Sequence, residues 1–416
     1  MVKIKSKFFL YIAVIAIFTL LIAIFNLDKI RSKARVAIPS DIRILIKEKF
    51  FGKKFIQELA YFRMSNYNQK ILPATQFEYL NIEEYQIDYF KGNKRFFIEP
   101  LNENILAINS NFNITLLSSK DFKIQKQISH NLQNLKFFEV LDFKISNKEI
   151  FTLGRQFKDA ENKCAYLVIY NGKIEEDSEI VFSKFFESQE CAISNKSAKI
   201  EISNYNNSDG LIIVTGANEA HGLSIEEKDR AQRNDSIFGK VLFLDASSKK
   251  ISQLAKGIRF PKSIYKYDNN YFFTDGYNNN GDELNKLEVG ANYGWPIVTI
   301  GEDDNAQNVL EKQNNFKYKK NHESLNFKEP LISFVPSILI NSFYKVPENF
   351  SEYWKNNFLI SAGSLLYRVK LNKDFTKVLF YEKIVAQKSM GDISYIKDYN
   401  FVVVASHGSL IKISKR

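Results

Sequence analysis

Cysteine, proline and glycine are scarce in this sequence of 416 residues. It has 2 cysteines, 8 prolines and 17 glycines, against 36 phenylalanines and 21 tyrosines. Cys164 and Cys191 are far apart in sequence and lack neighbouring histidines, which argues against a zinc site. A chain with so little proline and glycine and a hydrophobic fraction of 45% is not disordered in bulk. Its aromatic residues instead favour β-strands.

Motifs for nucleic-acid binding are also missing, although the formal net charge is +11. Most lysines are scattered, and the one dense basic stretch lies between Lys29 and Lys54, directly after an apolar segment. Such a stretch commonly contacts anionic lipid head groups. A general use of lysine as a surface residue explains the same charge equally well. We therefore expect a lipid bilayer, and no nucleic acid, among the partners.

The apolar segment runs from Phe8 to Phe25 and is interrupted only by Thr19. Its length is close to the roughly 20 residues that an α-helix needs to cross a bilayer. It is longer than the apolar part of most signal peptides, and no A-x-A-like cleavage site follows it. We predict an uncleaved transmembrane anchor at residues 8–26, preceded by a short tail at residues 1–7.

Two further regions follow the predicted anchor. Residues 27–80 have apolar residues at helical spacing among lysines, which predicts a juxtamembrane stalk of one or two short helices. In residues 81–416, short aromatic and β-branched runs recur between polar segments, with dipeptides typical of tight turns at Asn171-Gly172, Asp209-Gly210 and Asp275-Gly276. This pattern favours an all-β fold, and blades of roughly fifty residues would give a β-propeller of about six blades.

Five segments between residues 239 and 296 stand out. They are Gly239-Lys240-Val241-Leu242, Gly257-Ile258-Arg259-Phe260-Pro261, Thr274-Asp275-Gly276, Gly281-Asp282-Glu283-Leu284-Asn285 and Gly290-Ala291-Asn292-Tyr293-Gly294-Trp295-Pro296. Their order and spacing resemble the glucose/sorbosone dehydrogenase family, and weaker similarity continues to the C-terminus. The resemblance implies a six-bladed β-propeller that uses pyrroloquinoline quinone (PQQ) and calcium to oxidise sugars, with one histidine as general base.

The resemblance also bears on membrane orientation and on the cysteines. Basic residues flank the anchor on both sides, so the positive-inside rule does not decide its direction. The short tail, the single apolar segment and the resemblance favour a cytoplasmic N-terminus and a periplasmic or other extracytoplasmic domain. There we expect a disulfide between Cys164 and Cys191, although two buried free thiols would leave the same sequence.

The position of the family's catalytic histidine falls in the stretch from Asn195 to Lys199, which contains no histidine. The amide of Asn195 cannot accept a proton at neutral pH, and Lys196 would need a strongly lowered pKa. His221, the nearest histidine, follows the next predicted strand in a polar loop. Asn195, Lys196 and His221 are therefore the candidates for a catalytic base, and an exposed surface position is the alternative for His221.

The resemblance assigns a cationic cofactor contact to Arg259, but it finds Phe260 where the family has asparagine. The family's lysine falls near Ala362, and its arginine falls at Met390 or Gly391. Three lost contacts, at about 1.5 to 3 kcal/mol each, would weaken PQQ binding by orders of magnitude. The sequence therefore predicts that the quinone site is dismantled.

Calcium is a different case, because backbone carbonyls survive changes of side chain. The resemblance places such carbonyls at Gly276 and Tyr277, and the carboxylates of Asp282 and Glu283 lie nearby in sequence. These four residues are the candidate calcium ligands. The alternative is that Glu283 and Asn285 stabilise a turn through hydrogen bonds to backbone amides.

Three functions remain open at the level of the sequence. The first is a membrane-anchored binding protein that holds a sugar, a glycan or a protein across its funnel, with Arg259, Tyr277 and Asn278 as candidate contacts. The second is a PQQ-dependent sugar dehydrogenase with a rearranged active site, in which Lys196 or His221 replaces the base. The third is a structural module of a complex of envelope proteins.

Overall fold

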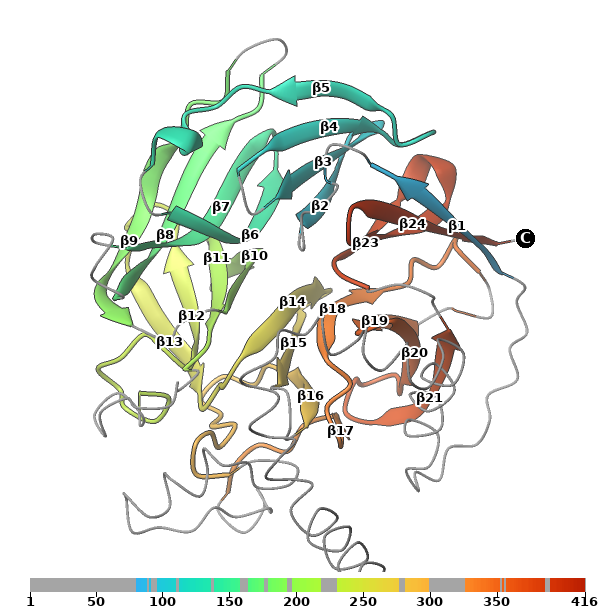
Figure 1. Ribbon diagram of the computed structural model, residues 1–416. Helices are drawn as coiled ribbons and strands as arrows, with labels where there is room; N and C mark the ends of the chain where they lie inside the picture. The colour runs from blue at the N-terminus through green and yellow to red at the C-terminus, as the bar shows by residue number, and fades with distance from the viewer. Residues whose placement is uncertain are drawn as a thin grey trace, which may run out of the picture. The chain divides into compact units, whose positions relative to one another are not determined.

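The computed structural model describes most of the chain after residue 79. The described residues are 80–87, 90, 96–109, 112–135, 138–157, 164–175, 179–192, 197–217, 230–276, 281–298, 326–351, 354, 357–385 and 390–415. Within them, β-strands form six four-stranded antiparallel sheets. The inner strands of these blades surround a central axis, and the outer strands lie at the circumference (Figure 1). This arrangement confirms the predicted six-bladed β-propeller.

The first three blades follow the order of the sequence. Blade 1 consists of β2 (Phe96–Leu101), β3 (Asn104–Asn109), β4 (Ile114–Ser118) and β5 (Ile124–Ile128). Blade 2 consists of β6 (Phe138–Ser146), β7 (Glu149–Phe157), β8 (Ala165–Lys173) and β9 (Ser183–Ala192). Blade 3 consists of β10 (Ala198–Tyr205), β11 (Ser208–Thr215), β12 (Lys240–Asp245) and β13 (Ile251–Lys256). The short 3-10 helix η2 (Leu132–Asn134) lies between blades 1 and 2 in sequence.

The last three blades complete the ring. Blade 4 consists of β14 (Pro261–Tyr267), β15 (Asn270–Gly276), β16 (Asp282–Lys286) and β17 (Ile332–Phe334). Blade 5 consists of β18 (Ile340–Lys345), β19 (Asn357–Ala362), β20 (Leu365–Leu371) and β21 (Val378–Val385). Blade 6 contains β22 (Ile393–Ile396), β23 (Phe401–Ser406) and β24 (Ser409–Lys415), with the 3-10 helix η5 (Lys397–Tyr399) before β23.

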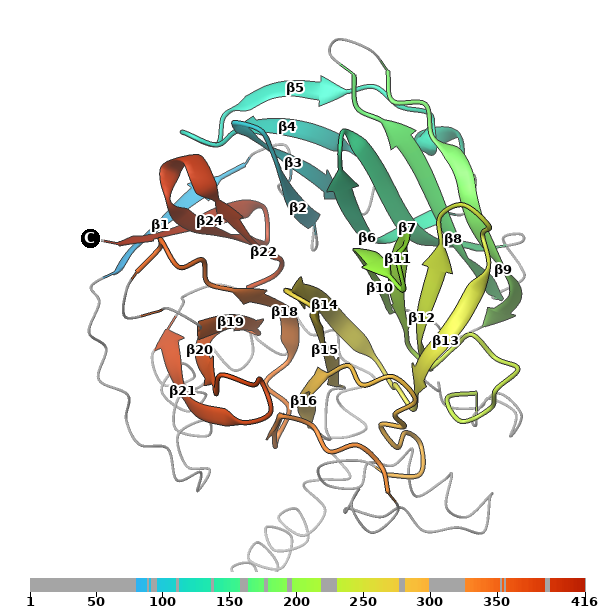
Figure 2. The same ribbon diagram turned by 180° about the vertical axis from the view of Figure 1, so that it is seen from behind.

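The fourth strand of blade 6 comes from the other end of the propeller sequence. Strand β1 (Leu80–Gln86) pairs antiparallel with β24, from Leu80 opposite Lys415 to Gln86 opposite Ser409. Both views of the ribbon show β1 beside β24 (Figures 1 and 2). The ring is therefore closed by backbone hydrogen bonds between the first and the last described strands.

The tight turns differ from those that the sequence predicts. Asn171-Gly172, Asp209-Gly210 and Asp275-Gly276 lie inside β8, β11 and β15, so their prediction as turns was wrong. A Cβ atom on Gly210 would lie 2.2 Å from the carbonyl oxygen of Leu244 on the neighbouring strand. This glycine therefore permits a close approach of two strands. Two-residue hairpin turns instead use asparagine at positive φ, as in the pair Asn206-Asn207 with φ of 50° and 62°.

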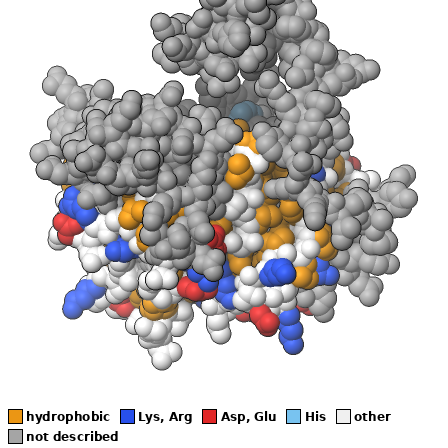
Figure 3. All heavy atoms as spheres, turned by 90° about the horizontal axis from the view of Figure 1, so that it is seen from below, with side chains coloured by type: hydrophobic (Ala, Val, Ile, Leu, Met, Phe, Trp, Pro, Cys, Tyr) orange, Lys and Arg blue, Asp and Glu red, His pale blue; other side chains and the backbone are white. Residues whose placement is uncertain are grey.

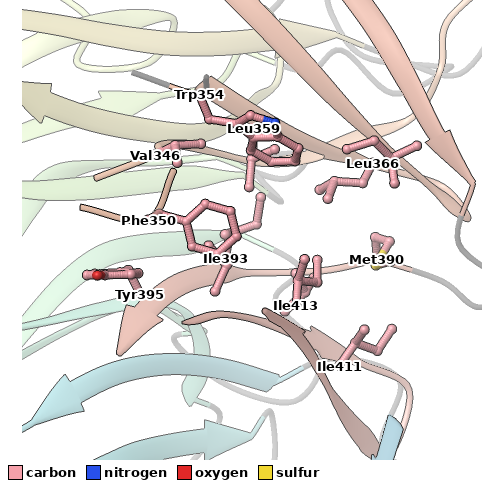
Figure 4. Close-up of a cluster of buried hydrophobic side chains, with 13 residues drawn as sticks. Val346, Phe350, Trp354, Leu359, Leu366, Met390, Ile393, Tyr395, Ile411 and Ile413 are labelled. Carbon is pink, nitrogen blue, oxygen red and sulfur yellow. The ribbon is translucent and has the colours of Figure 1, made fainter. Parts of the chain in front are cut away.

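Hydrophobic side chains fill the spaces between neighbouring blades. Figure 4 shows the cluster between blades 5 and 6, which contains Phe350 and Trp354 together with side chains of β22 and β24. Phe350 is 1% exposed and Trp354 is 0% exposed. Burial of one large apolar side chain contributes about 1.5 to 3 kcal/mol, so such clusters are the main source of stability between blades.

Aspartates link neighbouring blades by accepting hydrogen bonds from the backbone of an inner strand. In three cases one carboxylate oxygen accepts a hydrogen bond from a backbone amide of the next blade at 3.1 to 3.2 Å. The pairs are Asp142 with Ile200, Asp282 with Ile340, and Asp392 with Ile98. Charge-assisted bonds of this kind are stronger than neutral ones and help to fix the positions of these three inner strands.

Polar side chains also meet on the axis of the propeller. Glu99 on β2 forms an ion pair with Lys144 on β6, and Lys144 also interacts with Glu201 on β10. Tyr265 and Tyr344, from β14 and β18, continue the group with ring centroids 4.9 Å apart. Burial raises the pKa of Glu99 to about 7 and also raises the pKa of Glu201, because the single ammonium of Lys144 does not offset both carboxylates. We call these five residues the axial cluster.

The structure answers one question that the sequence leaves open. Cys164 and Cys191 form a disulfide that joins the start of β8 to the end of β9.

On the side drawn in Figure 3, basic and acidic side chains of the described residues are interspersed and form no single basic patch. This distribution agrees with the scattered lysines of the sequence.

The predicted anchor at residues 8–26 and almost all of the predicted stalk at residues 27–80 lie outside the described residues. In the part of the chain that the structure describes, no helix is both long enough and apolar enough to cross a membrane. The anchor therefore stays a prediction from the sequence.

Candidate functional site

The alternating strand directions bring many loops to one end of the propeller. In each blade the start of the innermost strand, the end of the second strand and the start of the third strand lie at the same end, because neighbouring strands are antiparallel. We call this the funnel end. The family-like residues Arg259, Phe260, Gly276, Asp282 and Glu283 lie at the starts or ends of such strands. The fold thus gathers residues that the sequence separates.

One cavity at the funnel end, which we call the funnel cavity, has a volume of about 110 Å³. It is formed where the inner strands of blades 1, 3, 5 and 6 begin, together with the turn between β23 and β24. Its lining residues are Phe96, Phe97, Lys199, Asn341, Met390, Gly391, Asp392, Ala405, Ser406 and His407.

Lys199 is the buried cation of the funnel cavity. Its Nζ donates a hydrogen bond to the carbonyl oxygen of Leu141 at 3.2 Å and lies 3.3 Å from Oδ1 of Asp142. The same ammonium lies 4.5 Å from the ring centroid of Phe97. The Asp142 carboxylate therefore offsets much of the charge that Lys199 would offer to a ligand.

The opposite wall of the funnel cavity carries no cation at the positions where the resemblance expects them. Met390 is 1% exposed, and its carbonyl oxygen accepts a hydrogen bond from Nδ2 of Asn341 at 2.7 Å. Ala362, where the resemblance expects a lysine, is fully buried on β19 and does not line the cavity. Asp392 adds a carboxylate that accepts hydrogen bonds from the Ile98 amide and from Oγ of Ser342. This wall is therefore neutral to acidic.

A second, smaller cavity of about 20 Å³ contains Arg259 and Trp295. The guanidinium carbon of Arg259 lies 4.1 Å from the indole centroid, and Nε1 of Trp295 donates a hydrogen bond to the carbonyl oxygen of Ala217 at 3.3 Å. Gly276 and Glu283 also line this cavity. A volume of this size admits about one water molecule or ion and excludes a sugar.

Two carboxylates face each other across neighbouring strands beside Arg259. Asp275 on β15 pairs in register with Glu283 on β16. The Asp275 carboxylate accepts hydrogen bonds from the backbone amides of Arg259 and Phe260. Burial, and next the charge of Asp275, raise the pKa of Glu283 to about 8. Glu283 is thus protonated at neutral pH and donates or accepts hydrogen bonds as a neutral acid.

The proposed calcium ligands do not all turn towards one point. The Asp282 carboxylate accepts hydrogen bonds from Oγ of Ser337 at 2.8 Å and from the Ile340 amide, so it faces blade 5. Glu283, the next residue on the strand, lines the Arg259 cavity. Among the described residues, no three histidine, cysteine or acidic side chains form a group that could hold a metal ion. Calcium at Gly276, Tyr277, Asp282 and Glu283 stays a prediction.

Several predicted residues lie outside the described part of the chain. They are the candidate bases Asn195, Lys196 and His221 and the candidate contacts Tyr277 and Asn278. Sequence reasoning missed Lys199, Asn341 and His407 as lining residues of the funnel cavity. Lys199 is the last residue of the stretch from Asn195 to Lys199, into which the position of the family's catalytic histidine falls. His407 lies in the turn between β23 and β24, and only the knowledge that this turn reaches the funnel end would have identified it.

Comparison with known proteins gives a consistent picture. The family model described as Glucose / Sorbosone dehydrogenase matches residues 146–412. No curated protein sequence matches the chain. Among solved structures, a glucose dehydrogenase has a TM-score of 0.62 and 16% identity, over 80% of this chain and 98% of that one.

Two aldose sugar dehydrogenases are similarly related. The soluble enzyme from Escherichia coli, in its apo-form, has a TM-score of 0.61 and 16% identity, over 81% of this chain and 100% of that one. The PQQ-bound enzyme from Streptomyces coelicolor has a TM-score of 0.57 and 12% identity, over 83% and 100%. At such identities these likenesses establish the fold.

Proposed function

Because this chain belongs to the glucose/sorbosone dehydrogenase family, we propose that its funnel cavity binds a neutral sugar or glycan without the quinone cofactor. The observation that carries the proposal is the polarity of the cavity wall. It combines the Phe97 ring with the amide of Asn341, the hydroxyl of Ser406 and the imidazole of His407. Aromatic faces and neutral hydrogen-bonding groups suit the apolar faces and hydroxyls of a sugar.

The described residues do not fit PQQ at this cavity. PQQ carries three carboxylates and calls for several cationic donors. Lys199 is already paired with Asp142, Met390 and Ala362 stand where the resemblance expects cations, and Asp392 adds a negative charge. Arg259 lies over Trp295 in the separate small cavity. We therefore derive no chemical step through the quinone.

Sugar oxidation at the same cavity is the second candidate function. It is favoured by His407, because histidine is the side chain that most often acts as a general base and His407 borders the funnel cavity. Lys196 and His221 stay candidates for the same role from the sequence. Turnover with an electron acceptor distinguishes this function from binding alone.

The proposal includes the anchor that the sequence predicts. A helix at residues 8–26 would hold the propeller at a membrane, with its funnel on the extracytoplasmic side, where glycans and envelope proteins are available as partners. Alkaline carbonate extraction of membranes tests this part. The full-length protein should stay in the membrane pellet, and a variant lacking residues 8–26 should be released.

Calorimetric titration of the full-length protein tests the binding function. Neutral aldoses and short glycans should bind, and Asn341→Ala should weaken the binding roughly tenfold, which corresponds to the loss of about one hydrogen bond. Asn134→Ala, at an exposed asparagine of η2, is the matched control and should leave the affinity unchanged.

A parallel titration uses PQQ with calcium, followed by an aldose oxidation assay with an artificial electron acceptor. We expect no binding of PQQ and no turnover. Tight PQQ binding with turnover would establish the dehydrogenase instead, and sugar binding that does not respond to Asn341→Ala would contradict the assignment to the funnel cavity.

A further inference from the structure

The carboxylate of Asp392 lines the funnel cavity and is bound only by neutral groups. The side chain is partly exposed. Its carboxylate accepts hydrogen bonds from the backbone amides of Ile98 and Ile393 and from Oγ of Ser342. In the described part of the chain, none of its contacts is an ion pair. Asp392 therefore presents a negative charge to the cavity.

The two ammonium groups near Asp392 are shared among four carboxylates. Nζ of Lys199 lies 3.3 Å from Oδ1 of Asp142. Lys144 interacts with Asp142, with Asp392 and with both glutamates of the axial cluster. Even with one glutamate protonated, three carboxylates remain for two ammonium groups. The surroundings of the cavity therefore favour a ligand with a positive charge.

Two further polar groups of the cavity can accept hydrogen bonds. Oγ of Ser406 is buried, and it has no hydrogen-bond partner among the described residues. Nδ2 of Asn341 donates to the carbonyl oxygen of Met390, which leaves Oδ1 as the acceptor of this amide. A protonated amine has three N–H donors and no acceptor. Its donors therefore match the acceptors of Asp392, Ser406 and Asn341.

The cost of removing water from Asp392 separates charged from neutral ligands. A ligand that fills the cavity displaces the water that contacts this carboxylate. A carboxylate that loses water without gaining a counter-charge is destabilised. An ammonium replaces the lost water with a charge-assisted hydrogen bond, which is stronger than a bond to a hydroxyl. The cavity therefore favours an amino group over a hydroxyl at this position of a sugar.

An inorganic cation fits the funnel cavity less well than an amine. Asp392 is the one acidic side chain among the described lining residues, whereas calcium usually takes six to eight oxygen ligands. A volume of about 110 Å³ has room for several water molecules. It therefore admits an amino group together with part of a sugar ring.

We propose that the funnel cavity prefers amino sugars, whose protonated amine binds Asp392, with Ser406 and Asn341 as further acceptors. This inference rests on the proposed sugar-binding function and adds the class of sugar. Neutral sugars bind through their hydroxyls, and the amine adds affinity. The net charge of the chain, +11, would by itself repel an amine, so such a preference reports the local site.

Calorimetric titration of the full-length protein at neutral pH tests the proposal. It compares D-glucose with two amino sugars that carry the amine at different carbons, D-glucosamine and 6-amino-6-deoxy-D-glucose. At least one amino sugar should bind about ten- to a hundredfold more tightly than glucose, as expected for a hydrogen bond to a charged group. N-acetylation removes the positive charge, so the N-acetyl derivative of that sugar should lose the gain.

Three variants assign the preference to the cavity. Asp392→Asn should abolish the preference and retain glucose binding, because the amide keeps the size and one acceptor of the carboxylate. Ser406→Ala should weaken amino-sugar binding several-fold without touching the bonds between blades. Asp398→Asn is the matched control, because it changes an exposed carboxylate in η5, at the opposite end of the same blade. It should leave all affinities unchanged.

The outcomes separate this inference from the function on which it rests. Glucose binding with no tighter binding of either amino sugar would overturn the inference and leave the proposed function standing. Absence of binding by every sugar would overturn the proposed function, and the inference with it. A preference that persists in Asp392→Asn and Ser406→Ala would put the amine elsewhere and overturn the inference. If Asp392→Asn does not fold, Ser406→Ala and N-acetylation decide.

Discussion

The guanidinium of Arg259 lies over the indole ring of Trp295, with its central carbon 4.1 Å from the ring centroid. Arg259 precedes the inner strand of blade 4, whereas Trp295 belongs to the long connection between β16 and β17. A cation over an indole face contributes about 0.5 to 2 kcal/mol. The contact also directs the guanidinium against an aromatic face at a site where the family resemblance predicts a cofactor contact.

The first prediction concerns Glu283. Its pKa in the folded protein is raised from the ordinary 4.5 to about 8, so the folded state binds this proton more tightly than the unfolded state. Stability should therefore fall as pH rises from about 4.5 to 8. Glu283→Gln should remove up to about 4 kcal/mol of this loss. Denaturant unfolding across that pH range measures the difference.

The raised pKa values of Asp275 and Asp282 also make stability fall as pH rises. Part of the dependence of stability on pH should therefore remain in the Glu283→Gln variant. If the free energy of unfolding of that variant changed with pH as it does in the unmodified protein, Glu283 would ionise normally in the folded protein.

The second prediction concerns Lys144 of the axial cluster. Lys144→Met would leave Glu99 and Glu201 without the ammonium that interacts with both. We expect a loss of about 3 to 5 kcal/mol above pH 7, where Glu99 would otherwise ionise. The loss should shrink as pH falls below the Glu99 pKa of about 7, because a protonated Glu99 carries no charge. Thermal unfolding at several pH values measures it.

The double variant Lys144→Met/Glu99→Gln serves as the control for this prediction. It should recover much of the stability at high pH, because the buried carboxylate has been replaced by an amide. A double variant no more stable than Lys144→Met would mean that Lys144 acts through packing alone.

The third prediction compares two glycines. Gly210→Ala would place Cβ 2.2 Å from the carbonyl oxygen of Leu244, and backbone atoms cannot easily move away. Gly290→Ala would meet no atom within 4 Å, although its φ of +84° imposes strain of about 1 to 2 kcal/mol. Gly210→Ala should therefore be the more destabilising, by more than about 1 kcal/mol. Equal losses in denaturant unfolding would contradict a close strand approach.

The fourth prediction concerns the disulfide, whose cysteines are separated by 27 residues. Cys164→Ser/Cys191→Ser should destabilise the protein by about 2 to 4 kcal/mol, mainly because the unfolded chain gains entropy. Unfolding of the variant and of the oxidised protein, with and without reductant, measures the loss. Reductant should shift the wild-type midpoint towards that of the variant and leave the variant unchanged.

Periodicity and family-like segments predicted the propeller well, because alternating short strands leave few other folds for a chain of this length. The turns were predicted less well. Gly172 and Gly210 are in strands, where atoms of the same blade exclude a Cβ. Close approach between strands is a property of tertiary packing and leaves no local signal in the sequence.

The sequence predicts residues of the site only where they belong to short family-like segments. Arg259, Gly276 and Glu283 follow from the family-like segments, and the structure places all three around one small cavity. Lys199 and His407 are more than two hundred residues apart and share the funnel cavity only because the ring closes. Such long-range neighbours require the topology, which sequence patterns do not provide.

The pairing of β1 with β24 has a consequence for biosynthesis. A ribosome synthesises β1 before the strands of all the other blades, whereas its partner β24, Ser409–Lys415, follows them. Until β24 has been synthesised, β1 has no native partner, and its backbone groups stay open to chaperones and proteases. A chain that stopped before Ser409 would lack β24, and neither β1 nor the rest of blade 6 could close the ring.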